Sequence, residues 1–378
     1  MIEVRRIEGR KALRRFVRFA IDLYRGNDCY VPPIIESEVD IMDTDVNPAF
    51  DFCESVYFMA YRDDRPVGRI AGFINSAANR KFNERQCRFG FVDFIDDEEV
   101  SRALLDAVRE WGRSKAMEEM VGPLGLTDLD YEGCLIEGFD QLSTSMTIYN
   151  YPYYRRHFEA YGLKQDAVWN EYRMKVPEQV PEKHVRISQI VATRLGLHVV
   201  HETNRKRIVR DWGMKIFRLL NEAYAPLYGY TELTDRQIKY YIDLWLPQVR
   251  LDMIRLVADK DDNLVAFGIS CPSLSRAQQK ANGRMWPFGW IHMAKAMYLK
   301  GGTDTFDLLL VAVRPDMQGK GVNAFLFTEL IPEANKNGYQ WAESNPELST
   351  NQKVQSQWSY FDPVCHKRRC TFKARIGD

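Results

Sequence analysis

The feature that most constrains the fold is an order of predicted elements that occurs twice along the chain. Two alternating strands joined by an aspartate-containing turn span residues 56–74, and the same pattern returns at residues 254–270. Each pair is followed by a buried strand, at Phe89–Ile95 and at Asp307–Val313. Because self-similarity over a long period indicates repeated structural units, we expect two related α/β domains.

Helical periodicity extends the repeat on both sides of these strands. The predicted helices are Ala12–Tyr24 and Ser101–Met117 in the first half, and Trp212–Ala223 and Asn323–Asn337 in the second. The remaining predicted strands are Ile2–Arg6, Met120–Leu124, Leu197–Glu202 and Tyr339–Glu343. The Pro- and charge-rich stretch Val176–Lys183 separates the halves, so domains are expected at residues 1–178 and 179–378.

Composition argues against several classes of protein. The chain has 52 Lys and Arg and 52 Asp and Glu, so its formal net charge is zero. A general nucleic-acid binder, which needs a basic excess, is therefore not expected. The longest apolar run, Leu308–Val313, is far shorter than the roughly 20 residues of a membrane-spanning helix. The first residues lack the apolar stretch of a signal peptide. We expect a cytoplasmic protein with no membrane partner.

The cysteines agree with that compartment. The chain has 7 scattered cysteines, which is typical of reduced thiols and not of a disulfide framework. Cys365, His366 and Cys370 could supply three metal ligands, but no second pair lies elsewhere at zinc-site spacing. The sequence predicts a strand at this position and no metal site.

One loop in the second half carries a chemical signature. After the buried strand, Arg314–Ala324 leads directly into a helix. Gly319 and Gly321 lack Cβ, so the backbone can turn tightly and an anion can approach the amides closely. Unpaired N–H groups and the helix dipole attract phosphate to a helix N-terminus, and Lys320 adds positive charge. The loop lacks the Gly-Lys-Ser/Thr ending of a P-loop.

The segment Gln318-Gly319-Lys320-Gly321-Val322-Asn323 follows a strand that ends Val311-Ala312-Val313. It resembles motif A of the GCN5-related N-acetyltransferase (GNAT) superfamily, Gln/Arg-x-x-Gly-x-Gly/Ala, from which Asn323 departs. The repeated order of elements also resembles that fold. The resemblance implies two tandem α/β domains, each a mixed, mostly antiparallel sheet flanked by helices. It further implies that the second domain binds acetyl-CoA or another acyl-CoA.

The resemblance also implies roles for single residues. Val311 and Val313 would offer backbone groups to the pantetheine arm, and Asn351 resembles the motif B asparagine that supports it. The pyrophosphate would lie against the amides of Gln318, Gly319, Lys320, Gly321, Val322, Asn323 and Ala324. Glu343, at a strand end, is the expected general base. Trp358 stands where the family has a tyrosine that protonates the leaving thiolate, so Tyr360 is the expected general acid.

Aromatic residues in two stretches are candidates for an acceptor pocket. Tyr228 and Tyr230 lie where the family's substrate loop follows the first helix, and Trp286–His292 lies in a segment that the first half lacks. Aromatic side chains supply a large contact area with a polar tip, although they also fill cores. At the position of the phosphate loop, the first half has the acidic stretch Asp93–Glu99, which would repel a pyrophosphate. The first domain is therefore expected to be a copy that lacks the phosphate loop.

Together these observations predict an N-acyltransferase that moves an acetyl or other acyl group from acyl-CoA to an amine. Direct attack by the amine is expected, without a covalent enzyme intermediate. The acceptor would be a small molecule or a peptide, and the protein a monomer with an internal pseudo-dimer or a homodimer. Two alternatives stay open. One is a transferase that takes its acyl group from aminoacyl-tRNA, and the other is a non-catalytic module that binds CoA or another metabolite.

Overall fold

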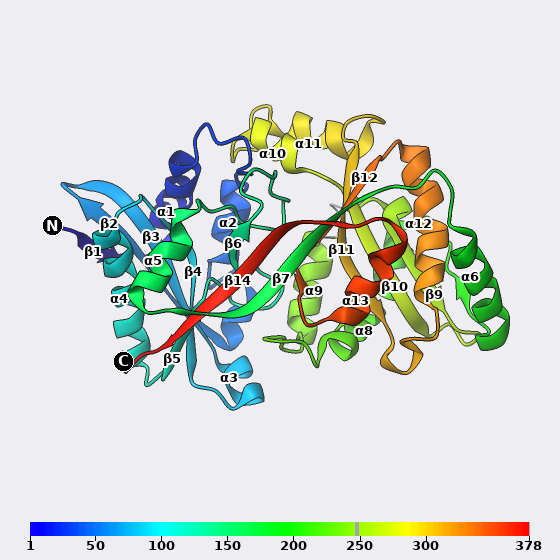
Figure 1. Ribbon diagram of the computed structural model, residues 1–378, viewed down its shortest axis with the longest axis horizontal. Helices are drawn as coiled ribbons and strands as arrows, with labels where there is room; N and C mark the ends of the chain where they lie inside the picture. The colour runs from blue at the N-terminus through cyan, green and yellow to red at the C-terminus, as the bar shows by residue number, and fades with distance from the viewer. Residues whose placement is uncertain (246–248, 378) are drawn as a thin grey trace. The chain divides into compact units, whose positions relative to one another are not determined.

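A computed structural model describes residues 1–245 and 249–377 (Figure 1). The chain forms two compact units. Unit 1 contains Met1–Asn170, Ser275–Met293 and the residues from His366 onward. Unit 2 contains Glu171–Leu274 and Ala294–Cys365. Each unit is therefore built mainly from one half of the chain, and unit 1 also takes two segments from the second half.

The sheet of unit 1 has the strand order β1-β2-β3-β4-β5-β14. These strands are β1 (Glu3–Arg6), β2 (Cys53–Arg62), β3 (Arg65–Asn75), β4 (Gln86–Phe94), β5 (Glu119–Gly122) and β14 (Val364–Arg375), and β6 (Cys134–Glu137) also pairs with β14. Neighbouring strands run antiparallel except β4 and β5, which are parallel. The helices are α1 (Arg10–Leu23), α2 (Ile35–Ile41), α3 (Ser76–Phe82), α4 (Glu98–Ser114), α5 (Tyr153–Tyr161) and α10 (Ser275–Ala281).

The sheet of unit 2 repeats this plan with the order β12-β11-β10-β9-β8, and the second part of β7 (Lys164–Lys175) pairs with β12. The strands are β8 (His198–Val199), β9 (Ile254–Ala258), β10 (Leu264–Pro272), β11 (Thr305–Val313), β12 (Trp341–Ser344) and the short β13 (Glu347–Leu348). Again one pair is parallel, β11 with β12, and the others are antiparallel. The helices are α6 (Glu182–Leu195), α7 (Arg205–Arg207), α8 (Met214–Tyr224), α9 (Asp235–Trp245), α12 (Asn323–Asn337) and α13 (Gln352–Gln355). The helix α11 (Gly289–Tyr298) is divided between the units: its residues up to Met293 belong to unit 1, and those from Ala294 onward belong to unit 2.

The equivalence of the two halves is clearest at the parallel pairs. In each unit one helix connects the two parallel strands, α4 between β4 and β5 and α12 between β11 and β12. The buried stripe of α4 packs so closely on β3 that a Cβ on Gly68 would lie 2.7 Å from Cδ1 of Leu104. The mixed, mostly antiparallel α/β architecture predicted from the repeat is confirmed.

Most predicted elements are present, and their differences have physical causes. The helix predicted at residues 323–337 has those bounds. Of the strand expected at residues 197–202, only His198–Val199 forms a strand, β8, and the N–H of Val200 makes one further backbone hydrogen bond to β9. The strand predicted around Cys365–Cys370 is β14. Since β14 pairs with β5, it belongs to unit 1, and the expected division into 1–178 and 179–378 lacks this exchange. That division stays a prediction about the repeat. Among the described residues, no helix is both long and apolar enough to cross a bilayer.

Candidate functional site

The two parallel strands of unit 2 separate halfway along β11. Their pairing runs from Thr305 opposite Trp341 to Leu308 opposite Ser344, where β12 ends. β11 continues to Val313 beside β10 and contains an irregularity where the register shifts between Leu308 and Leu310. Such a bulge bends a strand and re-aims its backbone groups. The second half of β11 consequently has an edge that faces away from β10 and is not paired with β12.

The backbone of that edge is bonded to side chains. The carbonyl of Leu309 accepts a hydrogen bond from Asn345 Nδ2 at 2.9 Å, and that of Val311 accepts one from the Tyr224 hydroxyl at 3.2 Å. The carbonyl of Val313 accepts one from Gln318 Nε2 at 3.2 Å. Side chains, and not a neighbouring strand, donate to these carbonyls. If the side chains rotate away, the amides of an extended ligand could donate to the same carbonyls instead.

The loop that follows β11 leads its amides to the start of a helix. Pro315–Met317 forms a short 3-10 turn, and Gly319 and Gly321 take φ values of 74° and 83°, which favour glycine. The amides of Gln318, Lys320 and Ala324 bond to carbonyls within the loop. Within the described part of the chain, no backbone turn bond uses the N–H groups of Gly319, Gly321, Val322 or Asn323. These N–H groups precede or begin α12, where the helix dipole favours an anion.

The two loop glycines have different surroundings. A Cβ on Gly319 would meet no atom within 4 Å, whereas a Cβ on Gly321 would lie 2.7 Å from Cγ2 of Ile187 on α6. Gly321 therefore allows the loop to approach α6 closely. The Asn323 side chain donates from Nδ2 to Oε1 of Gln357 at 2.8 Å. Asn323, which departs from the family pattern, is thereby bonded to the 3-10 turn Ser356–Tyr360.

The predicted acid and base lie on different elements of unit 2. Glu343 is on β12, with its carboxylate 3.8 Å from Nε of Arg173 on β7 and its side chain only 13% exposed. Tyr360 ends the 3-10 turn after α13 and is about half exposed, and its hydroxyl accepts a hydrogen bond from Lys183 Nζ at 2.5 Å. Asn351 directly precedes α13 and donates its N–H to the Leu348 carbonyl. These roles stay predictions.

Glu347 is an acid that the sequence analysis did not single out. Trp358, at the position of the family's tyrosine, is buried and donates from Nε1 to Oε1 of Glu347 at 2.8 Å. Burial raises the pKa of Glu347 to about 8, against the opposing effect of the Trp358 hydrogen bond. No periodic pattern marks this residue, and only the position of Trp358 would have suggested a buried polar partner.

The two predicted substrate tyrosines have different environments. Tyr228 is 37% exposed. Tyr230 is fully buried, and its hydroxyl donates to Oδ1 of Asn221 at 2.7 Å, which is the environment of a core residue. In the second aromatic stretch, Trp286, Phe288 and Trp290 are exposed on the surface of unit 1.

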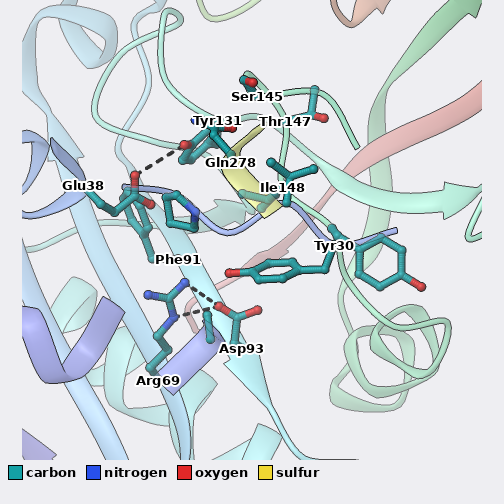
Figure 2. A pocket seen from close by; sticks show the side chains of 14 residues that line it. Tyr30, Glu38, Arg69, Phe91, Asp93, Tyr131, Ser145, Thr147, Ile148 and Gln278 are labelled. Carbon is teal, nitrogen blue, oxygen red and sulfur yellow. Dashed lines mark hydrogen bonds and ion pairs between the residues drawn. The ribbon is translucent and has the colours of Figure 1, made fainter. Parts of the chain in front are cut away.

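Unit 1 holds a buried polar cavity that sequence reasoning missed (Figure 2). Its volume is about 30 Å³, the space of one or two water molecules. Figure 2 shows the guanidinium of Arg69 on β3 paired with the carboxylate of Asp93 on β4, and the Tyr131 hydroxyl directed to Glu38 at 3.4 Å. A charged residue inside each of two apolar predicted strands was the available signal.

The charges in this cavity are strongly constrained. Nη2 of Arg69 lies 2.6 Å from Asp93 Oδ2, and Oδ1 of Asp93 accepts bonds from the hydroxyls of Tyr24 and Tyr154. Burial raises the pKa of Glu38 to about 7, although the positive charge of Arg69 opposes the shift. The arrangement can hold a proton near neutral pH, but the cavity is too small for a nucleotide cofactor.

The first turn of α4 in unit 1 lacks the features of the phosphate loop. The carboxylate of Asp97 accepts hydrogen bonds from the amides of Glu99 and Val100 at 2.9 and 3.4 Å. A carboxylate already occupies this helix N-terminus, which would repel a second anion. Ser101, His157 and Asp96 form a hydrogen-bonded row nearby. Ser101 is buried and its hydroxyl donates to the Glu98 carbonyl, so it is not an accessible nucleophile.

Comparison with curated proteins finds two relatives. The chain is 26% identical over 341 residues to Protein YghO of Escherichia coli K12, covering 87% of this chain and 83% of that protein. It is 23% identical over 291 residues to a bacterial ceramide synthase of Caulobacter vibrioides, covering 76% of this chain and 74% of that protein. No model of a known protein family matches the sequence.

Comparison with solved structures shows the fold. A tandem GNAT protein from the clavulanic acid biosynthesis pathway matches with a TM-score of 0.59 at 10% identity, over 100% of this chain and 99% of that one. A GCN5-related N-acetyltransferase from Sphaerobacter thermophilus matches with a TM-score of 0.52 at 12% identity, over 99% and 96% of the two chains. The resemblance identified from the loop and the repeat is confirmed at the level of structure: the chain has the fold of the tandem GCN5-related N-acetyltransferases.

Proposed function

We propose that the chain is an N-acyltransferase that binds acyl-CoA in unit 2 and transfers the acyl group to an amine. The observation that carries the proposal is the separation of β11 from β12 beside a glycine loop at the start of α12. This arrangement offers an extended polar edge and a set of amides at a helix N-terminus next to each other in the chain. A long ligand with amides at one end and phosphates at the other fits both.

The residues present suit the cofactor. The backbone of Val311 and Val313 would bind the pantetheine amides in place of Tyr224 and Gln318, with Asn351 in support. The amides of Gly319, Gly321, Val322 and Asn323, with the exposed Lys320, would bind the phosphates. Gln318 and Ala324, whose amides bond within the loop, would contribute less through their N–H groups. Bound acyl-CoA supplies an acyl group activated as a thioester.

The chain's own residues would move the protons. The carboxylate of Glu343 would accept a proton from the amine nitrogen as the C–N bond forms, and the C–S bond breaks. The phenol of Tyr360 would donate a proton to the leaving sulfur. Glu347 is a second candidate for this acid, because its raised pKa keeps it protonated near neutral pH. Tyr228, which is exposed, would contact the acceptor more readily than the buried Tyr230.

The acceptor class follows from the relatives. A ceramide carries a fatty acyl group on the amine of a long-chain amino alcohol, and the relative from Caulobacter vibrioides is described as a ceramide synthase. We propose a long-chain amino alcohol as acceptor and a fatty acyl-CoA as donor for this chain. The chain has zero net charge, whereas a protein that binds tRNA needs a basic excess. This favours acyl-CoA over aminoacyl-tRNA as the donor.

The test uses the full-length protein with a charge reversal and a matched control. Coenzyme A, acetyl-CoA and palmitoyl-CoA are titrated calorimetrically into the wild type, Lys320→Glu and Lys336→Glu. Lys320 precedes α12, whereas Lys336 lies in its last turn and pairs with Glu333. We expect Lys320→Glu to weaken binding by about tenfold or more, as for the loss of a phosphate contact of about 1.4 kcal/mol, and Lys336→Glu to bind like the wild type.

Turnover is measured separately, as release of free thiol when sphinganine or simple amines are added with acyl-CoA. Release that depends on the amine supports the transferase. Binding of acyl-CoA without thiol release across the amines would instead identify a module that only binds the cofactor. Equal affinities of the three proteins for coenzyme A would overturn the placement of the phosphates at this loop.

A further inference from the structure

Three large aromatic side chains are exposed in the connection from α10 to α11 and at the start of α11. Trp286 is 77% exposed, Phe288 is 68% exposed and Trp290 is 45% exposed, all in unit 1. Large aromatic residues are mostly buried in soluble domains, and neighbouring exposed apolar residues mark an interaction site. We call the residues Arg284–Trp290 the aromatic turn. It is coloured yellow in Figure 1.

The exposure comes from a fixed backbone. The N–H of Trp290 bonds to the Met285 carbonyl at 2.9 Å, and the Trp290 indole donates from Nε1 to the Pro287 carbonyl at 3.0 Å. A Cβ on Gly289 would lie 1.8 Å from the Arg284 carbonyl oxygen, so the turn is closed tightly. The rings of Trp286 and Trp290 lie 6.4 Å apart. The turn therefore holds its aromatic side chains together outside the core.

The base of the turn is anchored to the body of unit 1. The carbonyl of Gly283 accepts the N–H of Ile35 at 3.0 Å, and a Cβ on Gly283 would lie 2.8 Å from Ile21 Cδ1. On α10, the side-chain amide of Gln279 donates to the carbonyls of Asp28 and Tyr30. A surface anchored in this way loses little conformational entropy when it binds a partner.

Along the sequence, the stretch that contains the aromatic turn carries charge of one sign. Between Asp262 and Asp304 the sequence contains no Asp or Glu, and its five basic residues are Arg276, Lys280, Arg284, Lys295 and Lys300. Lys280 and Arg284, which come just before the aromatic residues in the sequence, are exposed. Because the whole chain has a net charge of zero, this run is a local basic excess. Basic residues near an anionic membrane are attracted to its surface.

We propose that the aromatic turn docks unit 1 on the surface of an anionic lipid bilayer. Trp and Phe side chains favour the level of the lipid headgroups, and Lys280 and Arg284 would contact the phosphates. The expectation of no membrane partner rested on the lack of a spanning segment, which a docking turn does not need. The inference stands on exposure and charge alone and does not depend on the proposed acyl transfer, although a lipid acceptor would be reached from such a surface.

The experiment measures binding of the full-length protein to sedimented vesicles. Vesicles of phosphatidylcholine with phosphatidylglycerol are compared with vesicles of phosphatidylcholine alone, at low and at high salt. The wild type should bind the anionic vesicles more tightly, and high salt should weaken this binding. The double variant Trp286→Ala/Phe288→Ala should lose affinity by about tenfold or more. Lys280→Glu/Arg284→Glu should remove the preference for phosphatidylglycerol.

A matched control removes exposed apolar residues elsewhere. Ile190 on α6 and Val364 on β14 are 52% and 61% exposed, and Ile190→Ser/Val364→Ser should bind vesicles like the wild type. Circular dichroism shows that each variant is folded. Absence of vesicle binding by the wild type, or equal binding by the aromatic variant, overturns the proposal. A change of molar mass in light scattering that depends on the aromatic turn would assign the surface to a second copy instead.

Discussion

Gly319 and Gly321, in the loop before α12, give a quantitative test of how that loop is packed. Replacing Gly319 by Ala places a side chain at φ 74° but meets no atom within 4 Å. The expected cost is the backbone penalty alone, about 1 to 2 kcal/mol. Replacing Gly321 by Ala adds a contact of 2.7 Å with Cγ2 of Ile187 on α6. Overpacking of this kind costs about 1 to 3 kcal/mol more.

The measurement must report on unit 2 alone, because a chain of two units has no single unfolding free energy. Native-state hydrogen exchange of amides in α6 and α12 gives this local stability. We expect Gly321→Ala to destabilise these amides more than Gly319→Ala does, by about 1 to 3 kcal/mol. Amides of α4 in unit 1 serve as an internal control and should not change.

A double-mutant cycle identifies the contact. Ile187→Ala removes the atom that the new methyl group would meet, so Gly321→Ala and Ile187→Ala together should cost less than the sum of the single changes. The same pair made with Gly319→Ala should be additive. If Gly319→Ala and Gly321→Ala are equally destabilising, or if both cycles are additive, α6 does not pack against this loop as described.

Two further predictions concern buried acids. Glu347→Gln should make the stability of unit 2 less sensitive to pH. Burial raises the pKa of Glu347 from 4.5 to about 8, so its contribution to stability is complete below pH 4.5 and is lost as the pH rises to 8. Hydrogen exchange of the α12 amides, measured against pH for the wild type and the variant, checks this. Asp93→Asn should destabilise unit 1 by about 3 to 5 kcal/mol because Arg69 stays buried without its partner. Hydrogen exchange of the α4 amides measures this cost. The exposed-pair control Glu159→Gln should cost under about 1 kcal/mol, and similar costs for the two variants would refute the argument.

Several features were predictable because they depend on neighbours in the chain. The period of apolar residues placed the helix at residues 323–337, and the alternation in residues 254–270 placed β9 and β10. Pro315, Gly319 and Gly321 predicted a turn between a strand and a helix, and the structure shows a 3-10 turn with two positive φ angles there. Local geometry of this kind follows from residue type and spacing.

The environment of the candidate site residues depended on side-chain contacts that no helical or strand period encodes. Tyr230 is buried with its hydroxyl bonded to Asn221 on α8, and the carboxylate of Glu347 is bonded to Trp358. The cavity of unit 1 combines Glu38, Arg69 and Asp93 from a helix and two strands with Tyr131 and Gln278 from later segments. No spacing in the sequence encodes which of these side chains meet.

The sequence by itself determined the type of each main element, the twofold repeat and the position of a loop suited to phosphate, because helix period, strand alternation and glycine geometry are local properties. The tertiary structure alone decided that β14 pairs with β5 and that Ser275–Met293 belongs to unit 1. It also decided which aromatic residues fill the core and which, like Trp286, remain outside it. Strand partners and burial are settled by competition among all possible long-range contacts, and a one-dimensional pattern records only the tendency to be buried.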